Sequence, residues 1–308
     1  MVSLAGRAPV LVAVVGGAYL AYRIITPVKA LSEASLRLAN GDYSQRIPVT
    51  SEDELGEMSK SFNKMAMELE HQENLRRRAM ADIAHELRTP LSVLQIDLES
   101  IEDGLVEPTD EAIQRLQKEV ELMSKLVDDL RLLSSAEAGE LRLDFHTLDL
   151  AGLVQAVVKR FEATAREQRV DMIFNEPGEE LWISGDEQRL VQVLLNLLTN
   201  AVNHTPPEGQ LVVKAEEAEE LVRVSIADTG VGISQEDLPH VFERLYRADK
   251  ARSREKGGSG LGLSIAKSII DAHGGSIRAE SEEGQGSIFT FELPYVPGEI
   301  EDPGPVPG

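Results

Sequence analysis

The chain has 308 residues, which is enough for two or more domains, each with its own core. Its formal net charge of −22 excludes proteins that are held on nucleic acid by a basic face, so we expect no nucleic-acid partner. There is no cysteine, which excludes disulfide frameworks, thiolate metal sites and cysteine nucleophiles.

The first predicted element is an apolar helix near the N-terminus. Residues 8–22 carry no charge, and two isoleucines follow Arg23. Because roughly 20 apolar residues cross a bilayer, we predict a transmembrane helix over 8–26, with a signal-peptide core as the alternative. The basic residues in and after it are Arg23, Lys29 and Arg37. They predict a single-pass protein of the cell membrane whose remaining domains lie in the cytoplasm.

Two short helices with an extended connector come next, over 27–75. Pro27 suits a first helical turn, and Asn40-Gly41-Asp42 ends that helix. The second helix carries apolar residues at alternating steps of three and four, namely Leu55, Met58, Phe62, Met65 and Leu69. This arrangement resembles a HAMP relay module, and Asp53-Glu54-Leu55-Gly56 matches the opening of its second helix.

Two longer helices are predicted over 76–103 and 111–135, because apolar residues again alternate in steps of four and three. Thr109 or Asp110 can cap the second helix. A single hairpin buries its narrow apolar seams poorly, whereas two copies form a four-helix bundle. We therefore predict a dimerisation hairpin over 76–140, and a homodimer.

The apolar seams of the relay and the hairpin do not join smoothly. Continued from Leu69 through Glu73 and Arg76, the steps read 4-3-4-4-3. Two fours in succession form a stutter, which locally unwinds a coiled coil. We predict a loosely packed connector between Glu70 and Arg78, where rotation of the relay helices changes how the hairpin helices sit.

The first hairpin helix carries the heptapeptide His85-Glu86-Leu87-Arg88-Thr89-Pro90-Leu91. With Ala84 and Leu87 in the seam, His85 falls outside it and faces solvent. An exposed imidazole nitrogen is a nucleophile toward phosphorus, and Glu86 is placed to orient the ring or accept its proton. Pro90 weakens or bends the helix one turn later. The simpler alternative is a surface histidine beside an incidental proline.

The heptapeptide resembles the phosphoacceptor box of bacterial two-component sensor histidine kinases. That resemblance implies that His85 is the phosphoacceptor and that Glu86 assists its phosphorylation. It also implies that Thr89 positions water for dephosphorylating the partner, the receiver domain of a response regulator.

From Leu148 the pattern changes to alternating helices and strands. Helices are predicted over 150–168, 186–203 and 264–272, and strands over 170–174, 181–184, 210–215, 221–227, 276–279 and 287–293. We predict an α/β two-layer sandwich over 146–296. The tail over 297–308, rich in Pro, Gly and acidic residues, is expected to be disordered.

The first motif of this domain is a set of polar residues at a predicted helix end. Asn196, Asn200, Asn203 and His204 follow one another at steps of four, three and one, which places them on one face. Amide oxygens are hard neutral ligands that suit Mg²⁺. Polar capping before Pro206-Pro207 is the plainer alternative.

Two glycine-rich motifs follow. Asp228-Thr-Gly230-Val-Gly232 comes after an apolar strand, and Gly258-Ser-Gly260-Leu-Gly262-Leu263 precedes a helix. Glycines let the backbone approach a ligand, and amides at a helix start can bind phosphates. A dinucleotide-binding fold is disfavoured, because no early βαβ unit precedes the second loop.

In this order the motifs resemble the Bergerat-type ATP-binding domain of histidine kinases, gyrase and the related heat-shock chaperone. The resemblance implies ATP and Mg²⁺, with Mg²⁺ at Asn200 and the adenine amino group at Asp228. Asn196 stands where the hydrolysing relatives have a glutamate base, which favours transfer over hydrolysis. Asn203 replaces a frequent Lys or Arg, so the phosphates need another cation. The candidates are Arg244, Arg247, Lys250, Arg252 and Lys256.

Together these features predict a sensor histidine kinase that phosphorylates His85 and passes the phosphoryl group to a response regulator, with phosphatase activity toward it. One rival is an ATPase machine without kinase activity, against which His85 and Asn196 both count. The other is a pseudokinase scaffold or phosphatase, which Thr89 permits in addition to kinase activity. The remaining histidines lack metal-ligand spacing and are interpreted as structural: His71, His146, His240 and His273.

Overall fold

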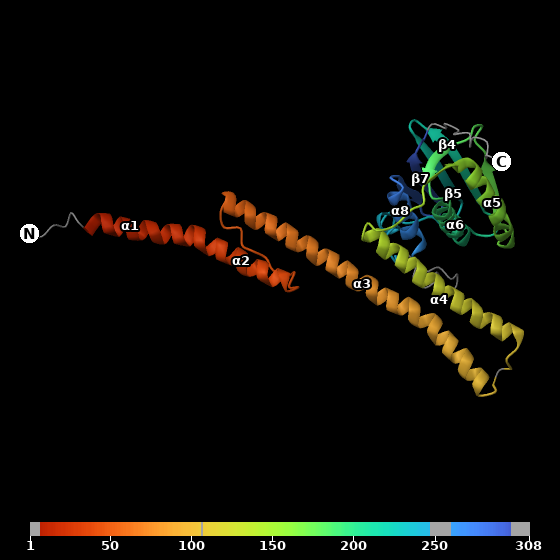
Figure 1. The fold of residues 1–308 in the computed structure, drawn as a ribbon, viewed down its shortest axis with the longest axis horizontal. Helices are drawn as coiled ribbons and strands as arrows, with labels where there is room; N and C mark the ends of the chain where they lie inside the picture. Colours follow the sequence, from red (N-terminus) through yellow and green to blue (C-terminus); the bar gives the residue numbers. More distant parts are fainter. Residues whose placement is uncertain (1–6, 106, 247–259, 297–308) are drawn as a thin grey trace, which may run out of the picture. The chain divides into compact units, whose positions relative to one another are not determined.

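The computed structural model describes residues 7–105, 107–246 and 260–296 (Figure 1). It divides into two compact units, Met1–Asp82 and Ile83–Gly308. One helix, α3 (Glu54–Glu102), contributes to both units. The tail over 297–308 lies outside the described residues, so its predicted disorder stays a prediction.

The first unit begins with α1 (Arg7–Leu20), a π-helical turn η2 (Ala21–Ile25) and α2 (Thr26–Ala39). None of the described helices combines the length and the apolar character needed to cross a membrane. The transmembrane helix predicted over 8–26 is therefore not found. The apolar run is instead divided between the 14 residues of α1 and the π-helical turn that contains Arg23.

A small core joins α2 to the first part of α3 in this unit. Its buried members are Ala34, Leu38, Ile47, Phe62 and Ala66. The extended connector is held by one side chain, because Ile47 N–H donates to Asn63 Oδ1 at 2.7 Å and Asn63 Nδ2 donates to the Ile47 carbonyl at 2.8 Å. Both polar groups of the Ile47 backbone are thus satisfied in a connector that is not itself part of a strand.

The start of α3 explains the Asp-x-x-Gly pattern. Asp53 Oδ1 accepts from Leu55 N–H at 3.2 Å and Gly56 N–H at 3.3 Å, so it satisfies two amides of the first turn. A Cβ atom at Gly56 would clash with the backbone carbonyl of Ser51. Only glycine lets the connector pass this close to the helix.

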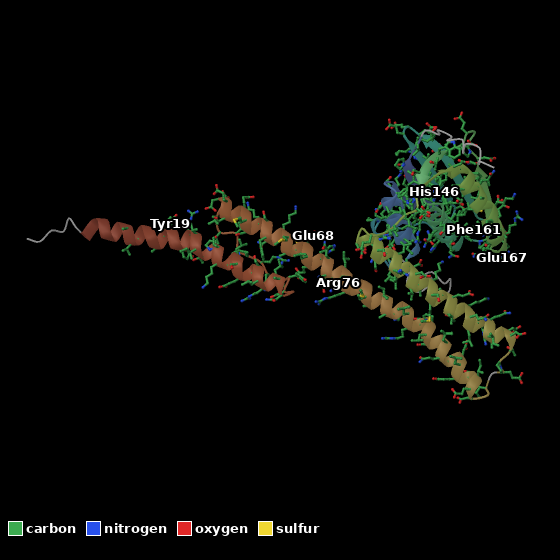
Figure 2. All side chains as sticks on the ribbon, in the orientation of Figure 1. Tyr19, Glu68, Arg76, His146, Phe161 and Glu167 are labelled. Carbon is green, nitrogen blue, oxygen red and sulfur yellow. The ribbon has the colours of Figure 1, made fainter. Side chains whose placement is uncertain are left out.

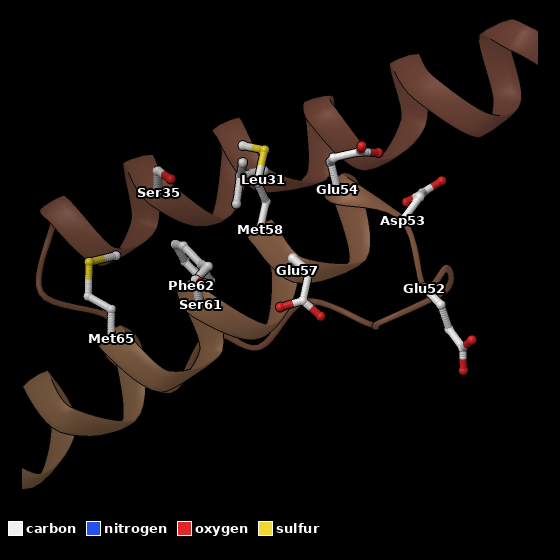
Figure 3. Close-up of a pocket in the computed structure, with 10 residues that line it drawn as sticks. All are labelled: Leu31, Ser35, Glu52, Asp53, Glu54, Glu57, Met58, Ser61, Phe62 and Met65. Carbon is white, nitrogen blue, oxygen red and sulfur yellow. The ribbon is translucent and has the colours of Figure 1, made fainter.

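A groove of about 960 Å³ lies between α2 and α3 (Figure 3). Its apolar lining includes Leu31, Met58, Phe62 and Met65, and the acidic residues Glu52 and Asp53 lie toward one end. Met58 and Met65 are each 48% exposed. Two members of the apolar seam predicted from the alternating spacing are therefore left exposed within one chain, whereas Phe62 of the same seam is buried.

Helix α3 passes without a break from the relay segment to the hairpin. The two helices predicted on either side of residues 70–78 are thus a single helix of 49 residues. In the polar stretch Glu73 pairs with Arg76 at 3.0 Å and Arg77 at 2.9 Å (Figure 2 labels Arg76). Ion pairs at these spacings support a helix that has no apolar seam. The stutter stays a prediction.

In the second unit, the end of α3 and α4 (Asp110–Glu137) form the predicted hairpin. Thr109 is the cap, because its Oγ1 accepts from Ala112 N–H at 3.3 Å. Pro90 lies inside α3, which continues past it. Several large apolar side chains of the hairpin are exposed, including Ile96, Leu98, Ile113, Val120 and Val127.

The remainder of this unit is an α/β domain, as predicted. A five-stranded sheet has the order β2-β4-β5-β7-β6, and its strands are β2 (Asp171–Asn175), β4 (Gln210–Ala218), β5 (Leu221–Asp228), β6 (Ser276–Glu282) and β7 (Gly286–Pro294). A two-stranded sheet pairs β1 (His146–Asp149) with β3 (Trp182–Gly185). Of these strands, β1 alone was not predicted.

Three helices cover one face of the large sheet: α5 (Leu150–Glu167), α6 (Glu187–His204) and α8 (Gly262–Ala272) (Figure 1). Buried residues alternate along β5, with Val222, Val224 and Ile226 directed into the core. Phe161 of α5, labelled in Figure 2, also belongs to this core.

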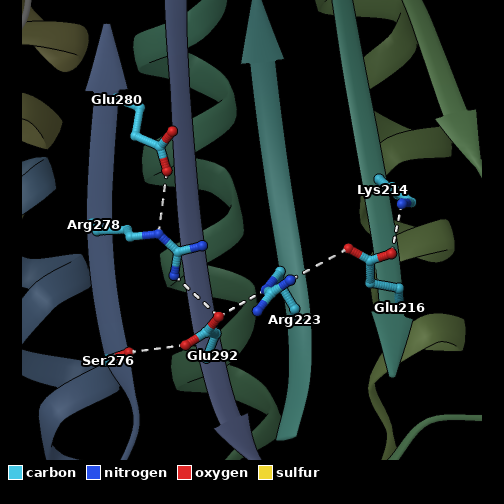
Figure 4. Close-up of polar contacts among 7 residues, drawn as sticks. All are labelled: Lys214, Glu216, Arg223, Ser276, Arg278, Glu280 and Glu292. Carbon is cyan, nitrogen blue, oxygen red and sulfur yellow. Dashed lines mark hydrogen bonds and ion pairs between the residues drawn. The ribbon is translucent and has the colours of Figure 1, made fainter. Parts of the chain in front are cut away.

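The other face of the sheet carries a ladder of charged residues (Figure 4). Glu292 lies between two arginines, at 2.7 Å from Arg223 and 3.0 Å from Arg278. Hydrogen bonds from Arg223 and then Arg278 lower the pKa of Glu292, which keeps it ionised. These cross-strand pairs hold β5, β7 and β6 in register.

Candidate functional site

The side chain of His85 is exposed on α3. Thr89 Oγ1 donates to the backbone carbonyl of His85 at 3.2 Å, one turn along the helix. Leu87 is half-buried and packs against the hydrophobic core that α4 shares with the α/β domain. For Glu86 the structure describes only the helical backbone. The nucleophile candidate therefore stands outside the apolar packing of its helix.

Helix α6 presents the predicted polar face. Asn196, Asn200 and Asn203 are half-buried, and His204 is exposed in the last turn. Asn196 Nδ2 donates to the backbone carbonyl of Gly262 at 3.1 Å. Because Gly262 is the first residue of α8, this bond joins the middle of α6 to the start of α8. The first and last predicted motifs thus meet, although 66 residues separate them.

Asp228 ends β5 and is only 7% exposed. Its Oδ1 accepts from Gly230 N–H at 2.8 Å. Burial raises the pKa of Asp228, and the backbone amides of Gly230 and Ser287 act in the opposite direction. A carboxylate held in so dry a place is a strong acceptor for an amino group that enters it.

The loop after Asp228 needs its glycines. A Cβ atom at Gly230 would clash with the His204 carbonyl, and one at Gly232 would clash with the Glu282 carbonyl. Gly232 also has φ +71°, which favours glycine. Val231 N–H donates to the His204 carbonyl at 3.2 Å. The loop is thus pressed between the end of α6 and the end of β6.

The last glycine motif leads into α8. Leu245 N–H donates to the Gly260 carbonyl at 3.0 Å, and both residues have positive φ, at +57° and +70°. Gly262 opens α8, and Leu263 is half-buried against the core. Gly258 lies outside the described residues. The amides of the first turn of a helix lack partners within the helix, so those at the start of α8 are suited to phosphate oxygens.

Of the five candidate phosphate-binding cations, Arg244 is engaged elsewhere. Its Nη2 donates to the Leu133 carbonyl at 2.9 Å and pairs with Glu137 at 2.8 Å, both at the end of α4. The expectation that Arg244 steadies the phosphates therefore lacks support. The other four lie outside the described residues: Arg247, Lys250, Arg252 and Lys256.

His273 joins the far ends of the two helices that carry the motifs. It caps α8 and is 6% exposed. Its Nδ1–H donates to the Ile269 carbonyl at 2.8 Å, and its Nε2 accepts from Asp186 N–H at 3.0 Å. Asp186 in turn caps α6 through Arg189 N–H. Burial lowers the pKa of His273, so the neutral ring is the stable form. The structural role expected for this histidine is confirmed.

Sequence reasoning missed two paired serines on β6 and β7, of which Ser287 is the strand partner of Asp228. Ser287 is its partner in the pairing of β5 with β7, and Ser281 accepts from Ile233 N–H at the end of the loop. Nothing in the spacing of these serines marks them. Their proximity to Asp228 follows from strand register, which the sequence pattern leaves undetermined.

The residues present fit Mg²⁺ by their chemistry. Asn200 offers a neutral amide oxygen one helical turn after Asn196, on the side of α6 that reaches the start of α8. Mg²⁺ takes one or two protein ligands and completes its octahedron with phosphate oxygens and water. An amide on the side of α6 that reaches a helix start suited to phosphate oxygens meets that requirement.

Three family models match the chain. The HAMP domain matches residues 19–71, the His Kinase A (phospho-acceptor) domain 75–139, and the histidine kinase-, DNA gyrase B- and HSP90-like ATPase 185–297. The three matches follow one another in the order in which the motifs occur.

Individual proteins are similar over most of the chain. The signal transduction histidine-protein kinase BaeS of Escherichia coli (strain K12) is 40% identical over 275 residues, which are 89% of this chain and 59% of BaeS. The sensor histidine kinase WalK of Bacillus subtilis (strain 168) is 39% identical over 240 residues, 76% of this chain and 39% of WalK. The chain thus spans less than two thirds of the length of these relatives.

Two solved structures share the fold. The histidine kinase AdeS of Acinetobacter baumannii has a TM-score of 0.58 at 32% identity, covering 68% of this chain and 97% of that one. The histidine kinase ThkA, in complex with the response regulator protein TrrA, has a TM-score of 0.56 at 26% identity, covering 74% and 66%.

Proposed function

The chain belongs to the sensor histidine kinases with HAMP, phosphoacceptor and ATPase domains, and we propose that it transfers the terminal phosphoryl group of ATP to its own His85. The observation that carries the proposal is the exposed imidazole of His85 in a chain that also holds the Asn196–Gly262 and Asp228 motifs. A nucleophile and a nucleotide pocket in one chain make self-phosphorylation the simplest chemistry.

The transfer is a displacement at phosphorus. A ring nitrogen of His85 bonds to the terminal phosphorus, the bond to the bridging oxygen breaks, and ADP leaves. The proton of the ring passes to Glu86, the next residue in the sequence. Such a transition state requires mainly positioning and charge stabilisation. The exposed position of His85 on its helix and the nucleotide pocket each provide a part of these.

The pocket holds ATP through two kinds of contact. Asp228 accepts from the adenine amino group, and the glycines Gly230, Gly232 and Gly260 let the loops of the pocket pack closely against neighbouring backbone. The amides at the start of α8 bind phosphate oxygens. Mg²⁺, when bound at Asn200, neutralises phosphate charge. Asn203, His204 and Leu263 complete the nucleotide-binding residues in this proposal.

Asn196 favours transfer over hydrolysis. An amide is not a base, so it cannot activate water as a glutamate would. Its amide nitrogen is also engaged with the Gly262 carbonyl at 3.1 Å, which gives this residue a positioning role at the phosphate loop. The rival reading as a plain ATPase machine therefore has no base at the expected place.

The phosphoryl group then passes to an aspartate in the receiver domain of a response regulator. The complex of ThkA with TrrA supports a partner of this class. Thr89, exposed four residues after His85, would position water for the reverse role, removal of phosphate from the regulator. The phosphoacceptor domain match and the open apolar seams of the hairpin support a homodimer.

Attachment to the cell membrane is a separate part of the proposal. Large apolar side chains are exposed on α1 and η2, among them Val14, Val15 and Tyr22. An apolar surface of this kind favours a lipid or protein contact. The chain should sediment with membranes in cell fractionation, and a variant without residues 8–26 should remain in the supernatant.

Incubation of the full chain with γ-labelled Mg-ATP tests the kinase proposal. Label that is acid-labile and base-stable, and that is lost in His85→Gln, is the expected result. The matched control is His71→Gln, which changes another exposed histidine of α3. Free phosphate without labelled protein would instead favour the ATPase machine, and nucleotide binding without either product would favour the scaffold.

A further inference from the structure

Ser281, the penultimate residue of β6, uses all the hydrogen-bonding capacity of its hydroxyl. It donates to the Gly286 carbonyl at 2.7 Å and accepts from Ile233 N–H at 2.8 Å. Its Oγ is also 3.0 Å from the Oγ of Ser287. A hydroxyl carries one proton, and Ser281 uses it in the hydrogen bond to the Gly286 carbonyl. Ser287 is therefore the donor in the bond between the two hydroxyls.

The three partners of Ser281 belong to the two segments that flank Asp228. Ile233 ends the loop that begins at Asp228. Gly286 and Ser287 start β7, and Ser287 pairs with Asp228 in the sheet. The Ser281 side chain therefore links the loop that follows Asp228 to β7, the strand that pairs with Asp228.

The loop that follows Asp228 is also in close backbone contact with the end of β6, the turn after it and the start of β7. Gly284 N–H donates to the Val231 carbonyl at 2.7 Å. Added Cβ atoms would clash at Gly232 with the Glu282 carbonyl and at Gly286 with the Asp228 carbonyl. Because these backbone contacts are so close, loss of a hydrogen bond at Ser281 is expected to displace the loop after Asp228 relative to the start of β7.

From this arrangement we infer that Ser281 is a positioning residue for nucleobase recognition, which sets the Asp228 carboxylate in place to accept from an exocyclic amino group. The inference rests on the proposed function, since it assumes that Asp228 receives adenine. Ser281 itself does not touch the nucleotide; it acts through Ile233 and Ser287.

The expected effect falls on base recognition and leaves the phosphate end of the pocket unchanged. Guanine presents a carbonyl oxygen where adenine presents its amino group, so a well-placed carboxylate favours ATP over GTP. A displaced carboxylate loses this preference, whereas contacts at the start of α8 are kept. Loss of a hydrogen bond of this kind costs about 1.4 kcal/mol, or about tenfold in affinity.

The test measures the affinities of Mg-ATP and Mg-GTP for the full chain by calorimetry, together with the KM and kcat of His85 labelling. Ser281→Ala should weaken Mg-ATP binding and raise KM about tenfold, with Mg-GTP affinity and kcat changed less than twofold. Ser281→Thr keeps the hydroxyl and should restore the preference for ATP. Ser281→Cys keeps the side-chain size with a weak acceptor, and gives the same loss if the alanine variant does not fold.

The matched control is Ser276→Ala, on the same strand, whose hydroxyl is 3.4 Å from Glu292 on the ladder face. It should leave both affinities at the wild-type values. A folded Ser281→Ala protein with unchanged preference for ATP would overturn the inference and leave the proposed function intact. Equal loss in the alanine and threonine variants would overturn it too. A wild-type chain that binds no Mg-ATP would instead refute the proposed function.

Discussion

The acid sensitivity of the α/β domain should depend on His273. Its neutral ring accepts from Asp186 N–H at 3.0 Å and donates to the Ile269 carbonyl at 2.8 Å. Protonation would place a second N–H against the Asp186 amide. The burial that lowers the pKa of His273 below 6.5 also means that the unfolded chain takes up the proton first. The nearby Asp186 carboxylate opposes this effect but does not reverse it.

The sign and size follow from linkage. Between pH 6.5 and the lower pKa of the folded state, the unfolded chain binds more protons, so stability falls as the pH falls. At pH 5.5 protonation stabilises the unfolded chain by up to about 1.4 kcal/mol for one histidine. This is the largest loss in the free energy of unfolding that one such group can produce at that pH. For a domain of this size that corresponds to a fall of about 3 to 6 °C in Tm.

The comparison is between the wild-type chain and His273→Gln, whose amide oxygen can still accept from Asp186 N–H. The variant loses the bond to Ile269 and should be less stable at pH 7.5 by about 1 to 2 kcal/mol. Because glutamine does not titrate, the difference in unfolding free energy between the wild-type chain and the variant should narrow by up to about 1.4 kcal/mol at pH 5.5. Trp182 is the single tryptophan and lies on β3, so its fluorescence during urea unfolding reports on this domain.

His146→Gln serves as the control, since its ring is 69% exposed and lies in the same domain. This variant should show the same change in unfolding free energy between pH 7.5 and pH 5.5 as the wild-type chain. If the unfolding free energies of the wild-type chain and His273→Gln change in parallel over pH 5.5–7.5, the reasoning is refuted.

Three further predictions concern recognition, docking and signalling. Asp228→Asn should lower Mg-ATP affinity by at least about 30-fold in calorimetry, because an amide can place a donor against the adenine amino group; unchanged affinity would remove Asp228 from the pocket. Arg244→Ala should speed amide exchange at the last turn of α4 by up to about tenfold, since the hydrogen bond to the Leu133 carbonyl and the ion pair with Glu137 are lost; exchange at wild-type rates would show that these contacts add no stability. Deleting four residues between Glu70 and Arg78 should smooth the heptad register and fix His85 labelling at one level; labelling that still responds to stimulus would contradict the stutter.

The α/β domain was largely predictable because local and global signals agree there. The α6 boundaries were placed within one residue, since Asp186 is a strong cap and Pro206 prevents continuation. The residues of the nucleotide motifs were found because they are spaced along single elements. β1 was missed because four residues, two of them exposed, show too little alternation to mark a strand.

Other features needed information that no local pattern carries. Ser281 reaches Ile233 across 48 residues, and only the sheet register brings them together. The continuity of α3 was not foreseen because the polar stretch has no apolar seam, whereas its ion pairs sustain the helix. The transmembrane prediction counted apolar residues and did not foresee the π-helical turn that ends α1.

The charged ladder on the sheet has a consequence for what can approach that face. Three cations and three anions are interleaved there: Lys214, Arg223 and Arg278 with Glu216, Glu280 and Glu292. Each charge is already matched by a neighbour, so an incoming surface of either sign gains little and must break pairs to bind. We therefore expect this face to disfavour stacking on a second sheet, so that partner contacts fall on the helices and loops around it.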